Sequence, residues 1–249
     1  MPRGISRYDE RLLQQVIPRI GQQVVNYENI NSAEYPNSSL LLYGNGGIGS
    51  AFIFDSSPIP KTITVFGDTK ISNEQSIFGG SSIYFDGTGD YLTAPSNSQF
   101  ALSGAYTFEL WYYQKGTKTA DYGIFAIRQA GGFAIDVDNS PRGICLIRFA
   151  QAIEITTNTL PTQGAWNHIA VVRNNSNVTS IFLNGTRIGT ATITTSYSQG
   201  LAEIGAYNAG FVIDDGYISN LRLVKGIAAY DPSSSTITVP NAPFPNFGS

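Results

Sequence analysis

Residues 106–113 read YTFELWYY, a stretch in which bulky side chains recur at every second position. Successive side chains of an extended strand point to opposite faces. Two sets result: Tyr106, Phe108, Leu110 and Tyr112 on one face, and Thr107, Glu109, Trp111 and Tyr113 on the other. Because both sets carry aromatic rings, the pattern is typical of a central strand that is covered on both sides.

Short runs of the same kind extend from about Leu40 to Val239. They are rich in Ile, Val, Thr, Tyr and Phe, which suit a pleated, half-buried surface, and turn sequences such as DGTGD and NNSN separate them. In SIFLNGTRIG (180–189), Asn184-Gly185 predicts a tight β-hairpin. No amphipathic segment of helix length interrupts the runs, which argues against a parallel βαβ sheet. The sequence therefore predicts an all-β fold, a sandwich of two antiparallel sheets.

Composition narrows the class of protein further. Of 249 residues, 42% are hydrophobic and only 13% are charged, about half the usual share of charged residues. The net charge of −3 gives no attraction to nucleic acid. The chain has one cysteine, Cys145, and one histidine, His168, which exclude a disulfide framework and a multi-histidine metal site within one chain. No apolar run approaches the roughly 18 residues of a membrane span, so we expect no membrane insertion.

The first part of the chain differs from the rest. An apolar stripe at helical spacing consists of Leu12, Leu13, Val16, Ile17 and Ile20. It is compatible with one short helix, which is marginal alone in water and needs a surface to rest on. That surface is the main domain, another copy of the chain or a socket in a larger assembly. We therefore expect three parts: an attachment or oligomerisation arm (1–37), a sandwich domain (38–243) and a C-terminal tail (244–249).

Five motifs appear in the order found in laminin-G-like domains: FGGSSIYFDGTGDYLTAP (78–95), YTFELWYY (106–113), GAWNHIAVVR (164–173), SIFLNGTRIGTAT (180–192) and DDGYISNLRLVKGIAAYD (214–231). The chain thus resembles this branch of the concanavalin A-like lectin and glucanase superfamily over roughly residues 38–243. The resemblance implies a jelly-roll sandwich.

The opening MPRGISRYDE resembles the start of structural proteins of tailed bacteriophages, and it shows no apolar run of an export signal. This resemblance implies a virion component, a tail fibre, tail protein or capsid decoration, assembled in the host cytoplasm. Its partners would be other virion proteins and copies of itself, with a trimer favoured. Capsid and tail remain equal alternatives.

Two kinds of site are expected on the sandwich. Saccharide sites combine an aromatic face with amides and acids that bond hydroxyl groups. The residues predicted to bind a host-surface glycan are Tyr122, Tyr197, Tyr207 and Asn208. Laminin-G-like domains often carry one calcium ion at a loop rim, and the candidate ligands for Ca²⁺ are Asp121, Asp136, Asp138 and Asn139.

The superfamily also contains glycoside hydrolases, which use two carboxylates flanking a sugar bond. Asp136 and Asp138 alternate on a predicted strand and would share one face. Those enzymes typically carry a third acid five positions after the first, where this chain has Pro141. We therefore predict a non-enzymatic protein. A polysaccharide-degrading hydrolase and a capsid cement protein without ligand are the alternatives.

Other polar residues are expected to be structural. His168 lies inside a predicted strand without a nucleophile or a second histidine, which favours a buried, hydrogen-bonded role. Asp86 and Asp90 bracket the glycine turn DGTGD, where aspartates commonly bond the turn backbone.

Overall fold

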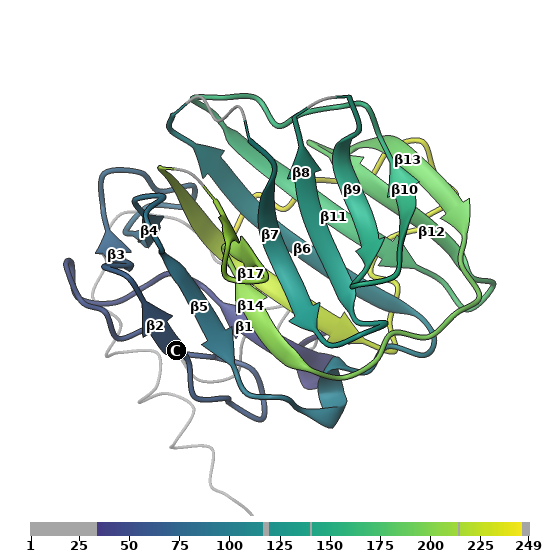
Figure 1. Ribbon diagram of the computed structural model, residues 1–249, viewed down its shortest axis with the longest axis horizontal. Helices are drawn as coiled ribbons and strands as arrows, with labels where there is room; N and C mark the ends of the chain where they lie inside the picture. Colours follow the sequence, from purple (N-terminus) through teal and green to yellow (C-terminus); the bar gives the residue numbers. More distant parts are fainter. Residues whose placement is uncertain (1–33, 117–119, 140, 214, 246–249) are drawn as a thin grey trace, which may run out of the picture. The chain divides into compact units, whose positions relative to one another are not determined.

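Two antiparallel sheets lie face to face in the computed structural model, which describes residues 34–116, 120–139, 141–213 and 215–245 (Figure 1). These residues contain no α-helix and two short 3-10 helices, η2 (Tyr35–Asn37) and η3 (Ser98–Phe100). The predicted two-sheet sandwich is confirmed. No helix within these ranges has the length and apolar character needed to cross a bilayer. The apolar stripe Leu12–Ile20 lies outside the described residues.

The first sheet, sheet A, has eight strands in the order β13-β12-β11-β6-β17-β4-β3, with β1 pairing β17. Their bounds are β1 Ser38–Leu42, β3 Lys70–Ser72, β4 Ser82–Phe85, β6 Tyr106–Gln114, β11 Trp166–Arg173, β12 Val178–Leu183, β13 Thr186–Thr192 and β17 Gly216–Lys225.

The second sheet, sheet B, has seven strands in the order β10-β9-β8-β7-β14-β5-β2. Their bounds are β2 Thr64–Phe66, β5 Tyr91–Ala94, β7 Tyr122–Arg128, β8 Phe133–Asp138, β9 Gly143–Arg148, β10 Ala152–Thr156 and β14 Leu201–Ile204. A separate hairpin consists of β15 (Ala206–Tyr207) and β16 (Phe211–Val212).

Strand β6 occupies the middle of sheet A, as its alternation predicts, between β11 and β17. Its first face packs into the main core between the sheets, where the rings of Phe108 and Phe125 lie 4.7 Å apart and those of Tyr106 and Phe133 lie 5.4 Å apart. Its second face, which includes Glu109, is also buried. Burial on both faces explains why this strand carries aromatic residues in both registers.

The hairpin predicted at Asn184-Gly185 joins β12 to β13. Both residues have positive φ, 49° and 83°, which matches the right-handed twist of the flanking strands. The Asn184 side-chain oxygen also accepts a hydrogen bond from the backbone N–H of His168 (2.8 Å). The turn is thereby tied to the neighbouring strand β11.

The C-terminal segment covers the outer face of sheet A. Ala228, Tyr230 and Ile237 pack on a small apolar cluster formed by Ala170, Val172 and Phe182. Farther along, the Phe244 ring lies 4.1 Å from the guanidinium of Arg222. The C-terminal segment also contacts the β12–β13 hairpin, where the Ile237 N–H donates to the Gly185 carbonyl (2.8 Å). It therefore lies both on the outer face of sheet A and beside this hairpin.

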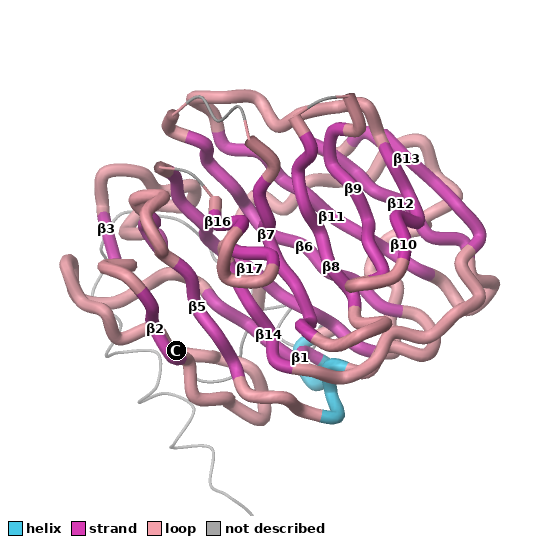
Figure 2. The backbone as a smooth tube through the Cα atoms, viewed as in Figure 1, coloured by secondary structure: helices cyan, strands magenta, loops and turns pink. Residues whose placement is uncertain are grey.

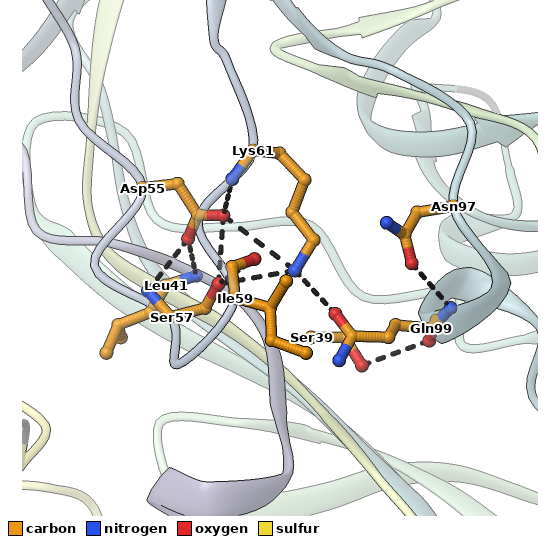
Figure 3. Close-up of polar contacts among 8 residues, drawn as sticks. All are labelled: Ser39, Leu41, Asp55, Ser57, Ile59, Lys61, Asn97 and Gln99. Carbon is orange, nitrogen blue, oxygen red and sulfur yellow. Dashed lines mark hydrogen bonds and ion pairs between the residues drawn. The ribbon is translucent and has the colours of Figure 1, made fainter.

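The segment between β1 and β2 has little regular structure and is fixed by one buried carboxylate, Asp55 (Figure 3). Its oxygens accept hydrogen bonds from the backbone N–H groups of Leu41 (3.1 Å), Ser57 (2.9 Å) and Lys61 (2.7 Å). The Lys61 ammonium lies 3.9 Å from the same carboxylate and donates to Gln99 in η3 (2.6 Å). Burial lowers the pKa of Lys61. Asp55 thus fastens this segment to β1.

Candidate functional site

Strand β8 presents carboxylates on the outer face of sheet B. Phe133, Ile135 and Val137 belong to the main core, so the alternate residues Asp136 and Asp138 point away from it. The neighbouring outward side chains of β7, β8 and β9 are apolar and buried: Ala126, Ala134, Cys145 and Ile147. An outer face that is buried must be covered by another part of the chain.

The β15–β16 hairpin supplies this cover and lies over β7 (Figure 2). It approaches so closely that a Cβ atom on Gly123 would lie 2.1 Å from the Tyr207 nitrogen. Only glycine fits at that point of β7. The Tyr207 ring packs 4.8 Å from the Phe149 ring. The hairpin is therefore seated directly on the outer surface of sheet B.

A buried carboxylate fixes the turn of this hairpin. Glu203 of β14 accepts a hydrogen bond from the Asn208 backbone N–H (2.7 Å) with one oxygen. Its other oxygen accepts from Arg128 (2.9 Å). Asn208 and Ala209 both have positive φ, 60° and 51°. The position of Asn208 is thus set through its backbone, while the residue itself is exposed.

A pocket of about 140 Å³ opens beside the hairpin, lined by Asp121, Tyr122, Asp136, Tyr207 and Phe211. The Phe211 side chain is 51% exposed, and its ring lies 6.4 Å from that of Tyr207. Two acidic and three aromatic residues therefore line one hollow. This combination offers apolar faces and hydrogen-bond acceptors to a ligand.

Asp136 is the unusual group of the pocket. Burial, together with the nearby charges of Asp121 and Asp138, raises the pKa of Asp136 to about 7, although the Arg142 charge opposes this rise. One of its oxygens, Oδ1, is buried and has no hydrogen-bond partner among the described residues. Burial likewise raises the pKa of the adjacent Cys145 thiol to about 12, so this cysteine stays protonated and unreactive.

The other predicted calcium ligands have partners within the chain. The Asp138 carboxylate is paired with the Arg142 guanidinium. The Asn139 backbone N–H donates to Asp121 Oδ1 (3.1 Å), and its side-chain amide donates to the Ala120 carbonyl. Of the four predicted ligands, Asp121 and Asp136 line the pocket.

A different trio of acids lies close together: Asp68, Asp86 and Asp90, with one oxygen of each within 4.8 Å of the others. Asp90 is buried, and its two oxygens accept hydrogen bonds from the backbone N–H groups of Asp68 (2.8 Å) and Asp86 (2.7 Å). The Asp86 side chain accepts from the Thr88 N–H (2.7 Å). The carboxylates of Asp86 and Asp90 therefore bond the turn backbone, as the sequence predicts, whereas that of Asp68 pairs with Lys70.

The residues predicted to bind glycan occupy different environments. Tyr207 lines the pocket, and Asn208 is exposed in the adjacent turn. Tyr122 contributes to the lining, but its side chain is buried in the core and its hydroxyl lies 3.0 Å from the Gln114 side-chain oxygen. Tyr197 is also buried in the core, with its hydroxyl bonded to Glu154. Tyr197 therefore offers no ring face to a ligand arriving from solvent.

Phe211 is the pocket residue that sequence reasoning missed. The signal was present, because Tyr207 and Phe211 flank the turn sequence Asn-Ala-Gly, and aromatic residues around such a turn are typical of a hairpin. A two-residue strand is too short to stand out among the longer runs.

A second polar cluster lies beneath the C-terminal segment and is closed. Glu109 is fully buried and accepts hydrogen bonds from His168 Nε2 (2.9 Å), Arg222 Nε (2.8 Å) and the Tyr230 hydroxyl (2.8 Å). Burial alone raises the pKa of Glu109, but His168 and Arg222 together hold it below its usual range. Because Glu109 and His168 are fully buried, the cluster serves to stabilise the fold, in line with the structural role predicted for His168.

These features define a lectin-like β-sandwich with a pocket on an outer sheet face. The chain belongs to the concanavalin A-like lectin/glucanases superfamily, since the laminin-G-type model of that superfamily matches residues 86–227, more than half of its length. The predicted superfamily is confirmed. No curated protein sequence matches the chain significantly.

Solved structures with the same fold include bacterial toxin binding domains. The binding domain of Paraclostridial Mosquitocidal Protein 1 is 13% identical, with a TM-score of 0.62 over 79% of this chain and 50% of that one. The binding domain of botulinum neurotoxin serotype D is 13% identical, with a TM-score of 0.60 over 78% and 49%. Botulinum neurotoxin type C, whose cell entry depends on interaction with two ganglioside molecules, is 13% identical, with a TM-score of 0.56 over 77% and 48%. The present chain spans about half the length of these structures.

Proposed function

We propose that this chain is a non-enzymatic, glycan-binding domain of a bacteriophage virion, and that it binds glycan at the pocket beside the β15–β16 hairpin. The observation that carries the proposal is the meeting of the Tyr207 and Phe211 rings with the Asp121 and Asp136 carboxylates. Aromatic faces pack against the C–H face of a pyranose, and carboxylates accept hydrogen bonds from its hydroxyl groups. The ganglioside dependence of one neighbour of similar fold supports the same class of ligand.

The acids of β8 support binding over hydrolysis. A glycoside hydrolase needs one carboxylic acid and one carboxylate, both free to reach the scissile bond. Asp136 lines the pocket, but Asp138 is buried and paired with Arg142. A carboxylate held by a guanidinium is a poor nucleophile or base, so the pair lacks its second member.

The place of the domain in a virion rests on the opening residues. The resemblance of MPRGISRYDE to phage structural proteins, together with the apolar stripe Leu12–Ile20, supports an attachment arm. We propose that this arm joins copies of the chain into a trimer or docks them on other virion proteins. The sandwich would then present its pocket to the host surface.

Glycan-array binding of the folded full-length chain tests the proposal. Replacing Phe211 with Ala removes an aromatic platform and should weaken binding by about tenfold. Phe52→Ala is the matched control, because Phe52 is 75% exposed but does not line the pocket. If the folded wild type binds no glycan, or if Phe211→Ala binds as wild type does, the glycan proposal fails and a ligand-free cement protein is favoured.

A further inference from the structure

We infer that the pocket selects a positively charged amino sugar, a hexosamine unit with a free ammonium group, over neutral and acidic sugars. The inference rests on the proposed glycan-binding function and specifies the ligand for the same pocket. It follows from the charges, the aromatic rings and the unsatisfied carboxylate that meet there.

The charge of the pocket favours a cation. Among the described residues that line it, two are acidic and none is basic. Arg142 is the described cation whose charge acts on Asp136, and its guanidinium is already paired with Asp138. The Cys145 thiol stays neutral. An incoming ammonium group would therefore lie beside two carboxyl groups that no described lining residue neutralises, and its charge would favour the ionised form of Asp136.

Asp136 has the properties of a group that awaits a cationic partner. Its Oδ1 is buried without a hydrogen-bond donor among the described residues, and burial makes its ionised form unfavourable. A buried polar atom without a partner costs free energy that a ligand donor can recover. An ammonium group supplies both the donor and the compensating charge.

The aromatic side of the pocket suits the same ligand. The Tyr207 and Phe211 rings, 6.4 Å apart and inclined at 72°, provide a face and an edge. Ring faces attract both the C–H groups of a pyranose and a nearby ammonium group. A hexosamine carries both features in one unit, whereas a simple alkylamine lacks the pyranose face and a glucose unit lacks the charge.

The same charges disfavour acidic sugars. The carboxylate of a sialic or uronic acid would lie near Asp121 and Asp136, with no basic residue among the described lining residues to pair with it. Like charges brought together at a partly desolvated site are repulsive. We therefore expect the acidic ligand to bind most weakly of the three classes.

Calorimetry at pH 6.5 with three oligosaccharides tests the inference: a glucosamine tetramer, an N-acetylglucosamine tetramer and an α2,8-sialic acid tetramer. We expect the glucosamine tetramer to bind at least about tenfold more tightly than the acetylated one, and the sialic acid tetramer to bind least. The preference should shrink as salt is raised, because it is electrostatic. Asp136→Asn should remove the preference for the glucosamine tetramer over the acetylated one. Asp68→Asn, an acid outside the pocket, is the matched control and should keep the preference.

The outcomes separate the two proposals. Three outcomes would overturn the amino-sugar inference alone, provided that Phe211→Ala still weakens binding. They are equal binding of the charged and acetylated tetramers, tighter binding of the sialic acid tetramer, and binding that EDTA abolishes and calcium restores. Failure of all three ligands and of the wider glycan array would overturn the proposed function itself.

Discussion

Buried acids in this sandwich differ in whether they have partners. Glu109 is fully buried and accepts hydrogen bonds from three side chains. Asp55 accepts four hydrogen bonds, three of them from backbone N–H groups. Asp136 lacks such a set and keeps one buried oxygen unsatisfied. The first two carboxylates stabilise the fold, whereas the third is the one that a ligand can satisfy.

Replacing Glu109 with Gln should destabilise the protein strongly. The change leaves the Arg222 guanidinium, whose side chain is 8% exposed, without its counter-charge. Breaking a buried pair in this way costs about 3–5 kcal/mol. Urea denaturation should show the loss, with Lys70→Gln as a control that changes stability by less than about 1 kcal/mol, because Lys70 pairs with Asp68 at the surface. Equal effects of the two changes would contradict the structural role of Glu109.

Asp136 should make stability fall as the pH rises. Its pKa is about 7 in the folded chain and about 3.9 in an unfolded one. Between these values the folded protein holds a proton that the unfolded chain releases, so raising the pH favours unfolding. Asp136→Asn should therefore reduce the stability loss between about pH 4 and pH 7 by about 4 kcal/mol, because the two pKa values differ by about 3 and each pKa unit corresponds to about 1.4 kcal/mol. Thermal melts of the wild type and of Asp136→Asn across this pH range measure the effect, and Asp68→Asn is the control. Parallel dependence of the melting temperature on pH in the wild type and Asp136→Asn would mean that Asp136 is ionised throughout.

Among the elements, the β15–β16 hairpin has the most direct link to the proposed function. It is short, yet it supplies Tyr207 and Phe211 and covers the outer face of β7. The position of the hairpin depends on Gly123 in β7 and on Glu203 in β14. Two strands of sheet B thus determine where the aromatic rings of the pocket lie.

Gly123→Ala should displace this hairpin. The added Cβ would lie 2.1 Å from the Tyr207 nitrogen and 2.4 Å from the Ala206 carbonyl carbon, which are backbone atoms that cannot rotate away. We expect glycan binding to fall by at least about tenfold, while circular dichroism keeps its β signal. Gly47→Ala is the control, because no atom lies within 4 Å of the Cβ position there. Unchanged binding in Gly123→Ala would mean that the hairpin does not shape the ligand site.

Local patterns predicted the elements well because alternation and turn chemistry are local. The two faces of residues 106–113 and the Asn184-Gly185 turn follow from spacing and φ preference alone. The turn role of Asp86 and Asp90 follows from the short-range reach of an aspartate side chain.

The site was harder to predict because burial of an aromatic residue depends on which strands meet. Tyr197 and Tyr207 look alike in the sequence, but one packs against Tyr106 and Phe133 in the core and the other lies on the outer face of sheet B. The convergence of Asp121 from the start of β7 with Asp136 from β8 likewise follows from strand pairing. Such contacts are not encoded in any single stretch.

At the scale of the whole molecule, the two outer faces of the sandwich are covered by different means. The C-terminal segment lies on sheet A, and the β15–β16 hairpin lies on part of sheet B. The second cover has a pocket beside it. We therefore expect ligand contact and attachment to use separate parts of the chain.

The arm should control assembly without affecting the sandwich. Leu13→Asp combined with Ile17→Asp in the full-length chain places two charges in the apolar stripe, which should convert the proposed trimer to a monomer. Light scattering coupled to size exclusion measures the mass. Phe211→Ala should leave the mass unchanged and serves as the control. A wild-type monomer, or a trimer that survives both charges, would contradict the proposed role of the arm.

Strand β17 has a consequence for how the protein is made. Residues 216–225 pair with β6 and β4 and with β1, which lies almost 180 positions earlier in the sequence. Sheet A therefore cannot be completed until β17 has been synthesised. Until then, the earlier strands have unpaired hydrogen-bonding edges. Such nascent chains fold slowly, and their unpaired strand edges are prone to aggregation. Chaperone supply and slow synthesis at low temperature should therefore govern the yield of soluble protein.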